Sequence, residues 1–444
     1  MSDASRENWS SRLGFTLAAV GSAVGLGNMW RFSYMAAENG GAAFVILYVA
    51  MTVLVGLPVM LAELTLGRGA RRSPVQALVH YGGRTWLPLG ALFVLTGVVI
   101  LAYYGVIAGW TLRYAVEALW SGFPADAGAH FEGRVAEGWD AVGWHVVFMV
   151  ATAWVVSGGI RGGIERAAIV LMPVLGLLVL GLAVYAAFQD GAGAGYAYYF
   201  RTDPTRILRA DVVQDAASQA FFSLSLGMGA ILTYASYLDR RHDLPREAAM
   251  IAVSDFSVAF VAGLVIFPLL FALGLESQVI GGGTGTVGAL FVVLPQAFAA
   301  MGPAGTAVGL LFFVALLVGG LTSAISLLEV VVASAMDGLH VERRRAAWLC
   351  AAGIALLGVP AALSTPVLGV MDQIGGNLFL VFGGFLLAIF VGWAMPGAVE
   401  EAGEGSAAPG LVAWRWLLRL VVPVVLAGVL FYSVQRTWVM LTGG

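Results

Sequence analysis

The sequence predicts an all-α integral membrane protein with eleven transmembrane helices. Of its 444 residues, 60% are hydrophobic and 11% are charged, whereas soluble domains carry about 25% charged residues. The mean hydropathy is +0.89, and apolar runs of about 20 residues, the length that crosses a bilayer, recur along the chain. A net charge of −3 and a single cysteine argue against a nucleic-acid-binding protein and a disulfide-stabilised scaffold.

The apolar runs between charged or glycine- and proline-rich breaks predict the spans. The first run is interrupted by glycines and lacks the cleavage pattern of a signal peptide, so we expect it to remain in the mature chain. The 285–301 stretch contains Pro295 and is too short to span, which favours a hairpin helix in an extracellular loop. We interpret 397–410, rich in glycine, alanine and glutamate, as a plain cytoplasmic loop. The predicted spans are 13–37, 41–67, 87–120, 143–158, 165–188, 214–239, 245–274, 304–337, 345–363, 373–395 and 411–441.

The arginines predict the orientation of the chain, because arginine-rich loops stay in the cytoplasm. Alternate loops carry several arginines, as at 71–72 and 343–345, and the intervening loops mix both signs of charge. We therefore expect a multi-pass protein of a bacterial inner membrane. Its N-terminus would be cytoplasmic and, after eleven spans, its C-terminus extracytoplasmic.

Two predicted spans are interrupted in the middle by glycine and polar residues. The first contains residues 21–28 (GSAVGLGN), and the sixth contains residues 223–229 (SLSLGMG). Glycine costs a helix interior about 1 kcal/mol, and unwound backbone is tolerated in a membrane only where it lines a protein cavity. Either segment alone is equally consistent with close helix packing through small residues. Two such segments at corresponding positions of two halves indicate an inverted-repeat secondary transporter, whose half-helix N-termini face an anion and whose freed carbonyls bind cations.

Three sequence blocks resemble the neurotransmitter:sodium symporter family, in particular its bacterial amino-acid-transporting branch. They are WSSRLGF at 9–15 with GSAVGLGNMWR at 21–31 and ENGG at 38–41; QAFFSLSLGM at 219–228 with TYASY at 233–237; and GGLTS at 319–323. The resemblance implies the leucine-transporter-type fold in a single domain, 1–444, with a five-helix repeat at 12–188, an inverted five-helix repeat at 214–395 and one additional helix at 411–441. It also implies a Na⁺-coupled symporter, and not an enzyme, that imports neutral, mainly hydrophobic L-amino acids by alternating access.

The resemblance further implies two sodium sites. A register shift of one residue in the seventh span would put Ser254 in place of one ligand, Asp255. At Ser223 the family commonly has threonine, and the hydroxyl is kept. The hydroxyls of Thr322 and Ser323 could instead cap backbone groups within the eighth span. The first site is carried over onto the Ala23 carbonyl and the side chains of Asn28, Ser223 and Asp255; the second onto the carbonyls of Gly21, Val24 and Gly319 and the hydroxyls of Thr322 and Ser323.

Asp255 is an acid within a predicted span, and an ionised carboxylate inside a membrane indicates a functional site. Animal relatives have asparagine at this position, and chloride-dependent relatives bring negative charge as a bound anion. The resemblance therefore implies that Asp255 supplies fixed negative charge and that transport needs no chloride. A hydrogen-bonded structural acid is the alternative interpretation.

The resemblance places an amino-acid substrate beside the first sodium, with its carboxylate at the amides of Leu26 and Gly27 and at the Tyr104 hydroxyl. No acid occupies the middle of the first span, so a free amine would find no counter-ion there. Met228 is flexible, where a leucine-preferring relative has phenylalanine, which favours a broad range of hydrophobic side chains. The expected substrate-binding residues are Ala23, Gly25, Leu26, Gly27, Ile100, Tyr104, Ile107, Phe222, Ser223, Ser225, Met228, Ser323 and Leu327.

The resemblance also implies two gates. Exposed ion pairs are worth about 1 kcal/mol or less, which suits gates that open in each cycle. Glu63 is expected to hydrogen-bond the unwound part of the first span, whereas Glu329 has no assigned role. The expected gate residues are Arg31, Asp372 and Gln219 on the outer side, beside Phe222, and Arg6, Trp9, Asp337 and Tyr237 on the inner side.

Three other functions remain alternatives at this point: a same-family transporter of another small zwitterion or amine, a cation channel and a membrane-embedded hydrolase. A channel would conduct without substrate, and a hydrolase needs a base beside its nucleophile. The sequence has no phosphate-binding glycine loop for ATP-driven transport and no clustered histidines for a further metal site. The expected partners are the substrate, Na⁺ and the lipid bilayer, without an obligate protein partner.

Overall fold

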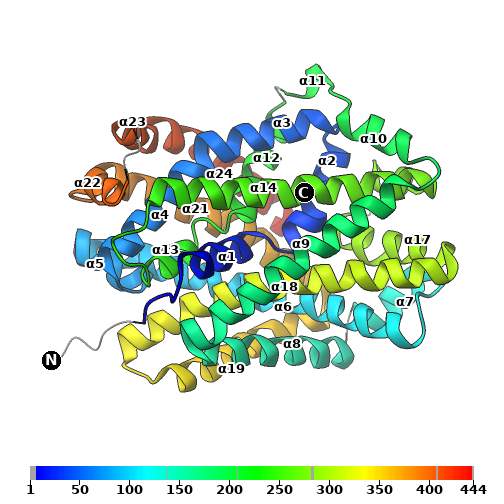
Figure 1. Cartoon of the computed structure of the whole chain (residues 1–444), viewed down its shortest axis with the longest axis horizontal. Helices are drawn as coiled ribbons and strands as arrows, with labels where there is room; N and C mark the ends of the chain where they lie inside the picture. Colours follow the sequence, from blue (N-terminus) through cyan, green and yellow to red (C-terminus); the bar gives the residue numbers. More distant parts are fainter. Residues whose placement is uncertain (1–6, 137, 208, 282–284, 407–408, 443–444) are drawn as a thin grey trace.

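The computed structural model describes residues 7–136, 138–207, 209–281, 285–406 and 409–442. This part of the chain is helical throughout, apart from turns and one isolated bridge between Gly41 and Thr202. The long helices run roughly side by side in one bundle (Figure 1). The predicted all-helical membrane fold is thus confirmed.

Nine helices are long and apolar enough to cross a membrane by length and composition. Each coincides with one of the predicted spans, because an uninterrupted apolar run has no turn chemistry to end the helix. They are α3–α4 (Ala42–Ala70), α6 with its first turn (Arg84–Trp120), α8 (Trp139–Ser157), α9 with its first turns (Ile160–Ala187), α14 (Leu244–Ala272), α18 (Gly302–Leu339), α19 (Arg343–Leu363), α20–α21 (Thr365–Ala394) and α23–α24 (Leu411–Met440).

The tenth predicted span begins eight residues earlier than expected. Its helix starts at Thr365 and not at 373, with Pro366 in the first turn. A proline is tolerated there because backbone N–H groups of the first turn have no partner within the helix. Asp372 therefore lies within this helix and not at its start.

The first predicted span is broken. Helix α1 (Arg12–Ala23) ends at Val24, whose ψ of 103° is extended. The chain resumes as a helix over Gly27–Glu38, which includes α2 (Phe32–Glu38), after a bend of 53°. Counting this bent pair as one span gives ten candidate spans among the described residues.

The sixth predicted span is broken as well. Helix α12 (Ala210–Ser223) and the short helix α13 (Ala230–Ala235) are separated by residues in turn conformation. Gly227 and Gly229 have positive φ angles of 77° and 74°, which glycine adopts without strain, and Ser225 has a φ of 55°. A left-handed conformation costs a residue with a side chain about 1–2 kcal/mol, so the surrounding structure must hold Ser225 in place.

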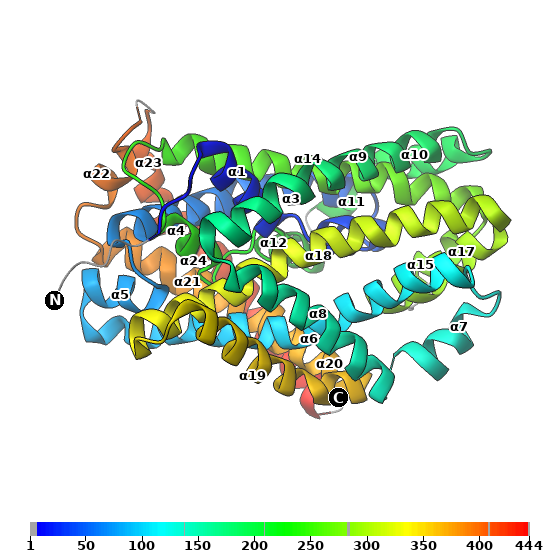
Figure 2. The ribbon, with the colours of Figure 1, turned by 60° about the horizontal axis from the view of Figure 1, so that its bottom comes forward.

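Short helices cover the two ends of the bundle. Following the predicted orientation, we name the end that carries α5 and α22 the inner end and the end that carries α10 and α17 the outer end. The two ends lie at opposite extremes of the bundle in both views (Figures 1 and 2). The short helices are α5 (Pro74–Gly82), α7 (Ala127–His130), α10 (Ala192–Phe200), α11 (Pro204–Ile207), α15 (Glu276–Val279), α16 (Gly285–Gly288), α17 (Leu294–Ala300) and α22 (Ala398–Gly403).

The interpretation of 397–410 as a plain loop is wrong for its described part. Helix α22 packs on α4 (Leu57–Ala70), with Ala398 and Ala402 fully buried. Arg68 of α4, whose side chain is fully buried, pairs with the Glu401 carboxylate at 2.8 Å and donates to the carbonyl of Glu404. The alanines give this segment an apolar face that its glycines and glutamates obscure in the sequence.

Candidate functional site

The first candidate cation site brings together Asn28, Ser223 and Asp255, from three different segments. The Asn28 amide nitrogen donates to Asp255 Oδ1 at 2.5 Å and to Ser223 Oγ at 2.9 Å. The Ser223 hydroxyl lies 2.9 Å from both carboxylate oxygens of Asp255. All three side chains are buried. A cation bound among them would need the Asn28 amide to turn its oxygen inward, away from the Gly25 N–H that it now accepts at 3.0 Å.

Sequence reasoning missed Tyr48 at this site. Its hydroxyl donates to Asp255 Oδ2 at 2.9 Å, and its ring is fully buried against Phe32 and Phe44. A tyrosine in the middle of the second span was the available signal, since a buried tyrosine hydroxyl needs a polar partner. Asp255 thus accepts from three side chains and has no cationic side chain among its hydrogen-bond donors in the described chain.

The second candidate cation site lies where α18 meets the end of α1. The Ser323 hydroxyl reaches across to the carbonyls of Gly21, Ser22 and Val24, at 3.4, 3.3 and 3.5 Å. These distances are long for hydrogen bonds, so one hydroxyl stands among three carbonyl oxygens without a close bond to any of them.

The Thr322 hydroxyl caps backbone groups of its own helix, which was the alternative to sodium binding. It bonds to the carbonyls of Val318 at 3.2 Å and Gly319 at 3.0 Å. A Cβ on Gly319 would lie 3.6 Å from the Val24 carbonyl oxygen, which shows how closely the two segments approach. Of the two hydroxyls, only that of Ser323 bridges α18 and α1 in this structure.

The expectation for Glu63 is wrong about the segment that it contacts. Its two carboxylate oxygens accept from the amides of Gly227 at 2.8 Å and Leu232 at 3.0 Å, both in the sixth segment. The reason is geometric: α4 packs directly on α13, and the first turn of α13 offers amides that have no partner within the helix.

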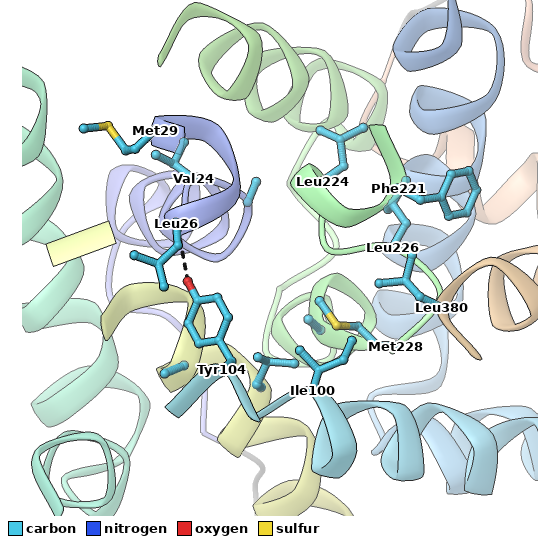
Figure 3. Close-up of a cluster of buried hydrophobic side chains, with 14 of the residues drawn as sticks. Val24, Leu26, Met29, Ile100, Tyr104, Phe221, Leu224, Leu226, Met228 and Leu380 are labelled. Carbon is cyan, nitrogen blue, oxygen red and sulfur yellow. Dashed lines mark hydrogen bonds between the residues drawn. The ribbon is translucent and has the colours of Figure 1, made fainter. Parts of the chain in front are cut away.

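A central cavity of about 20 Å³ lies between the two breaks. A water molecule needs about 10–15 Å³ by this measure, so the side chains have closed the space to little more than one water. All the predicted substrate-binding residues line this cavity except Leu26 and Ile107, and Leu380 joins them. In Figure 3 the side chains of Ile100, Met228 and Leu380 gather on one side of the space, and Tyr104 points at Leu26.

Tyr104 meets the backbone where the first segment is unwound. The Leu26 N–H donates to the Tyr104 hydroxyl at 3.2 Å (Figure 3). On the other wall, Ser225 donates to the Ser22 carbonyl at 2.7 Å and so ties the two breaks together. The cavity is therefore lined by unwound backbone and a phenol at one side and by apolar side chains at the other.

Arg31, Asp372 and Phe222 line a second cavity of about 90 Å³, as do Leu26 and Ile107, whereas Gln219 does not. Arg31 and Asp372 both line it, but the ion pairs of the described chain do not join them. Arg31 instead donates to the Asn377 side chain at 3.1 Å, and its guanidinium carbon lies 4.6 Å from the centre of the Phe222 ring. Gln219 donates to the Gly27 carbonyl at 3.2 Å.

The inner gate is assembled around Trp9. Its indole N–H donates to the Tyr234 carbonyl at 3.0 Å, and its amide donates to the Tyr237 carbonyl at 3.3 Å. Asp337 accepts from the Ser73 amide at 2.6 Å. Arg6, the predicted partner of Asp337, lies outside the described residues.

Glu329, which had no assigned role, is part of this inner closure. Its fully buried carboxylate pairs with Arg343 at 2.8 Å and accepts from the Tyr237 hydroxyl at 2.6 Å. Glu329 is on α18 and Arg343 begins α19, so their contact depends on how the two helices turn at the inner end. Glu329 therefore contacts Tyr237, one of the predicted inner gate residues, which sequence reasoning did not foresee.

These features define a class of protein. Two broken helices face each other across a small central cavity, oxygen-rich clusters flank it, and closed layers separate it from both ends. This is the arrangement of a secondary transporter whose site lies between discontinuous helices.

Comparisons with known proteins identify the family. The model of the sodium:neurotransmitter symporter family matches residues 6–132 and 133–440, and the chain belongs to this family. It is 32% identical to an uncharacterized sodium-dependent transporter of Methanocaldococcus jannaschii, over 100% of this chain and 93% of the relative, and 33% identical to the uncharacterized sodium-dependent transporter YhdH of Bacillus subtilis, over 96% and 97%. The crystal structure of MhsT in complex with L-phenylalanine superposes with a TM-score of 0.86 at 41% identity, over 96% of this chain and 99% of MhsT. The predicted family and fold are thus confirmed, and the protein is a multi-pass, sodium-dependent transporter.

Proposed function

We propose that the protein imports neutral, mainly hydrophobic L-amino acids together with Na⁺, by alternating access and without chloride. The observation that carries this proposal is the buried Asp255 carboxylate, in contact with Asn28 and Ser223. Burying a charge without a compensating one costs several kcal/mol, and the described side chains that hydrogen-bond Asp255 provide no positive charge. A sodium ion at this place would supply the missing positive charge.

The substrate proposal rests on the lining of the central cavity. The backbone at Gly25 and Gly27, beside the break in the first segment, and the Tyr104 hydroxyl suit a carboxylate, because amide and phenol groups donate to anionic oxygen. Ile100, Met228, Leu327 and Leu380 suit an apolar side chain. MhsT, the structural neighbour, was crystallised with L-phenylalanine, which supports a hydrophobic amino acid here as well. A cavity of 20 Å³ must expand to admit it, and the flexible Met228 allows that expansion.

We propose two sodium ions, the second near the Ser323 hydroxyl and the carbonyls of Gly21 and Val24. Neutral oxygens suffice there for binding but add no charge, so this ion depends on Asp255 and the substrate for compensation. The inverted repeat at 12–188 and 214–395, the cytoplasmic N-terminus and the extracytoplasmic C-terminus belong to the same proposal.

Uptake by purified protein in proteoliposomes tests the function. Radiolabelled L-leucine and L-phenylalanine should accumulate when Na⁺ is high outside, and accumulation should collapse when the sodium gradient is dissipated. Tryptamine should compete far less well than tryptophan, because it lacks the carboxylate. Accumulation without a sodium gradient would contradict coupling, and sodium current without substrate would indicate a channel.

Asp255→Asn tests the role given to the carboxylate. The substitution keeps a coordinating oxygen but deletes the charge, so uptake should fall at least tenfold or become dependent on chloride. Wild-type protein should transport equally in chloride and in gluconate. The control is Ser254→Ala, at the neighbouring position of the same helix. If Ser254→Ala impairs sodium dependence and Asp255→Asn does not, the ligand has been assigned one residue too far along the chain.

A further inference from the structure

A third cavity, of about 630 Å³, opens at the outer end and shares no lining residue with the other two cavities. It is formed by three parts of the chain: α2 (Phe32–Glu38), the first turns of α12 with the residues Arg206 and Arg209 before it, and the last turns of α24 (Val422–Thr442). Its volume falls in the range of about 300–1,000 Å³ that small-molecule sites occupy. Nothing in the proposed transport cycle uses this cavity.

The walls of the cavity carry both signs of charge in equal number. Asp215 and Arg436 face each other from α12 and α24 with a nitrogen–oxygen distance of 3.5 Å. Asp215 is mostly buried and is also held by the Asn39 amide at 3.2 Å, whereas the Arg436 side chain is 65% exposed. The remaining charged residues of the lining are Glu38, Asp211, Arg206 and Arg209.

Arg209 and Asp211 are already paired with each other, which distinguishes them from Asp215 and Arg436. Arg209 and Asp211 are 2.6 Å apart, and the hydrogen bond from Arg209 keeps the pKa of Asp211 below its ordinary value. Both therefore stay ionised at neutral pH. Asp215 and Arg436, in contrast, are separated by more than the 2.7–2.9 Å of a charge-assisted hydrogen bond, which leaves each able to accept a ligand group.

We propose that this cavity binds a zwitterion that carries an ammonium group and an anionic group a few ångströms apart. The anionic group would take donors from Arg436, and the ammonium would sit at the Asp215 and Glu38 carboxylates. Met35, Val212 and Val439 supply an apolar wall for the rest of the ligand. Two sources present this chemistry at the outer end: a free amino acid, and the headgroup of a phospholipid such as phosphatidylethanolamine.

A ligand in this cavity would touch elements that the gate also uses. Helices α2 and α12 are the outer halves of the two broken segments, and α24 is joined to the outer gate through Thr437, Gln373 and Asn377, which bonds Arg31. An occupied cavity would therefore hold α24 against both outer half-helices.

Protection of an introduced thiol tests the proposal without relying on transport. Gln435→Cys places a thiol at the exposed edge of the cavity, in a Cys350→Ser background that removes the native cysteine. Labelling by a methanethiosulfonate reagent is followed in sodium-free buffer, which keeps the sodium-dependent central site from binding. The control thiol is Ala304→Cys, which is exposed at the outer end and does not line the cavity.

In lipid-free detergent, L-leucine at ten times its dissociation constant should slow labelling of the cavity thiol roughly tenfold and leave the control thiol unaffected. Leucinamide and 4-methylpentanoate, which carry one charge each, should protect far less. If the lipid headgroup is the natural occupant, labelling should instead be slower in phosphatidylethanolamine vesicles than in phosphatidylglycerol vesicles. Asp215→Asn and Arg436→Gln should each abolish the protection.

Equal labelling rates with and without L-leucine, and in both kinds of vesicle, would overturn the proposal. So would protection that survives in both Asp215→Asn and Arg436→Gln while the control thiol still reports an intact outer end. Neither result depends on uptake, so a failure here is distinguishable from a failure of the proposed function.

Discussion

The inner and outer ends of the molecule are closed by different kinds of contact. At the inner end, the Glu329–Arg343 pair is almost fully buried and includes the Tyr237 hydroxyl. A second pair, Arg12 with the buried carboxylate of Glu247 at 2.6 Å, joins α1 to α14. Ion pairs with buried carboxylates therefore hold the inner end closed.

The outer end is closed by a ring and an amide. Phe222 lies under the Arg31 guanidinium, and Arg31 donates to Asn377. A cavity of about 90 Å³ lies beside them. Cation–π contacts are worth about 0.5–1 kcal/mol at exposed sites and about 2 kcal/mol when desolvated, less than the cost of breaking a buried charge pair, about 3–5 kcal/mol.

This difference in contacts indicates which end opens more easily. Opening the inner end exposes several charged groups together, so it needs a larger change in free energy than opening the outer end. We therefore expect the protein to rest with its inner end shut and to admit ligands from the outer side. Substitutions at the inner end should therefore shift the conformational equilibrium most.

The largest effect is expected from Arg343→Ala. Removing one partner of a buried ion pair costs about 3–5 kcal/mol, because the Glu329 carboxylate remains buried without its countercharge. The inner end should open and sodium-driven uptake should be lost. The measurement is labelling of a thiol at Ala333→Cys, a buried position one turn beyond Glu329, in a Cys350→Ser background.

Arg344→Ala is the matched control, since Arg344 is adjacent and exposed. It should leave both labelling and uptake near wild type. Equal damage from the two substitutions would show that general positive charge at this turn matters and not the pair. Glu329→Gln combined with Arg343→Gln removes both charges and should recover part of the inner closure.

A smaller effect is expected from Arg68→Ala, which releases α22 from the inner end. Arg68 bonds the Glu401 carboxylate and the carbonyls of His242 and Glu404. Hydrogen bonds to charged groups contribute about 1.5–3 kcal/mol, so cleavage by a glutamate-specific protease at Glu400, Glu401 and Glu404 should accelerate roughly tenfold or more. Arg72→Ala, at an exposed arginine just after the end of α4, should not change the cleavage rate. Unchanged cleavage in Arg68→Ala would mean that α22 is held by its alanines alone.

The two broken segments and the polar residues of the first candidate cation site could be predicted from the sequence. Both broken segments were predictable, since a run of glycine and polar residues inside an apolar span is a local signal. Asn28 and Asp255 stood out for the same reason: each is polar where the surroundings are not. The family resemblance then supplied their common site.

The contacts that close the inner end could not be predicted in this way. Arg68 and Glu401 lie 333 residues apart, and nothing local to either residue indicates the other. Glu329 and Arg343 are only 14 residues apart, but a turn between two helices separates them, and its geometry decides whether they meet. Tyr48 was missed because thirteen tyrosines in a membrane protein are individually ordinary, and what distinguishes this one is its hydrogen bond to Asp255, 207 residues away.

The smallest effect is expected from Asn377→Ala at the outer end. The substitution removes the acceptor of the Arg31 hydrogen bond, which is only partly buried, and leaves the central cavity untouched. A loss of about 1 kcal/mol should speed release of bound amino acid to the outer side roughly fivefold, with little change in sodium dependence. Gln373→Ala is the control, because Gln373 bonds Asn377 and Thr437 but not Arg31. Release rates measured by dilution of preloaded protein should therefore rise in Asn377→Ala and stay near wild type in Gln373→Ala. If release slows in Asn377→Ala, Arg31 has formed a stronger contact with another residue. The Asp372 carboxylate, its predicted gate partner, lines the same cavity and is that residue. That outcome would mean that Asn377 keeps the outer gate weak by diverting Arg31 from its acid.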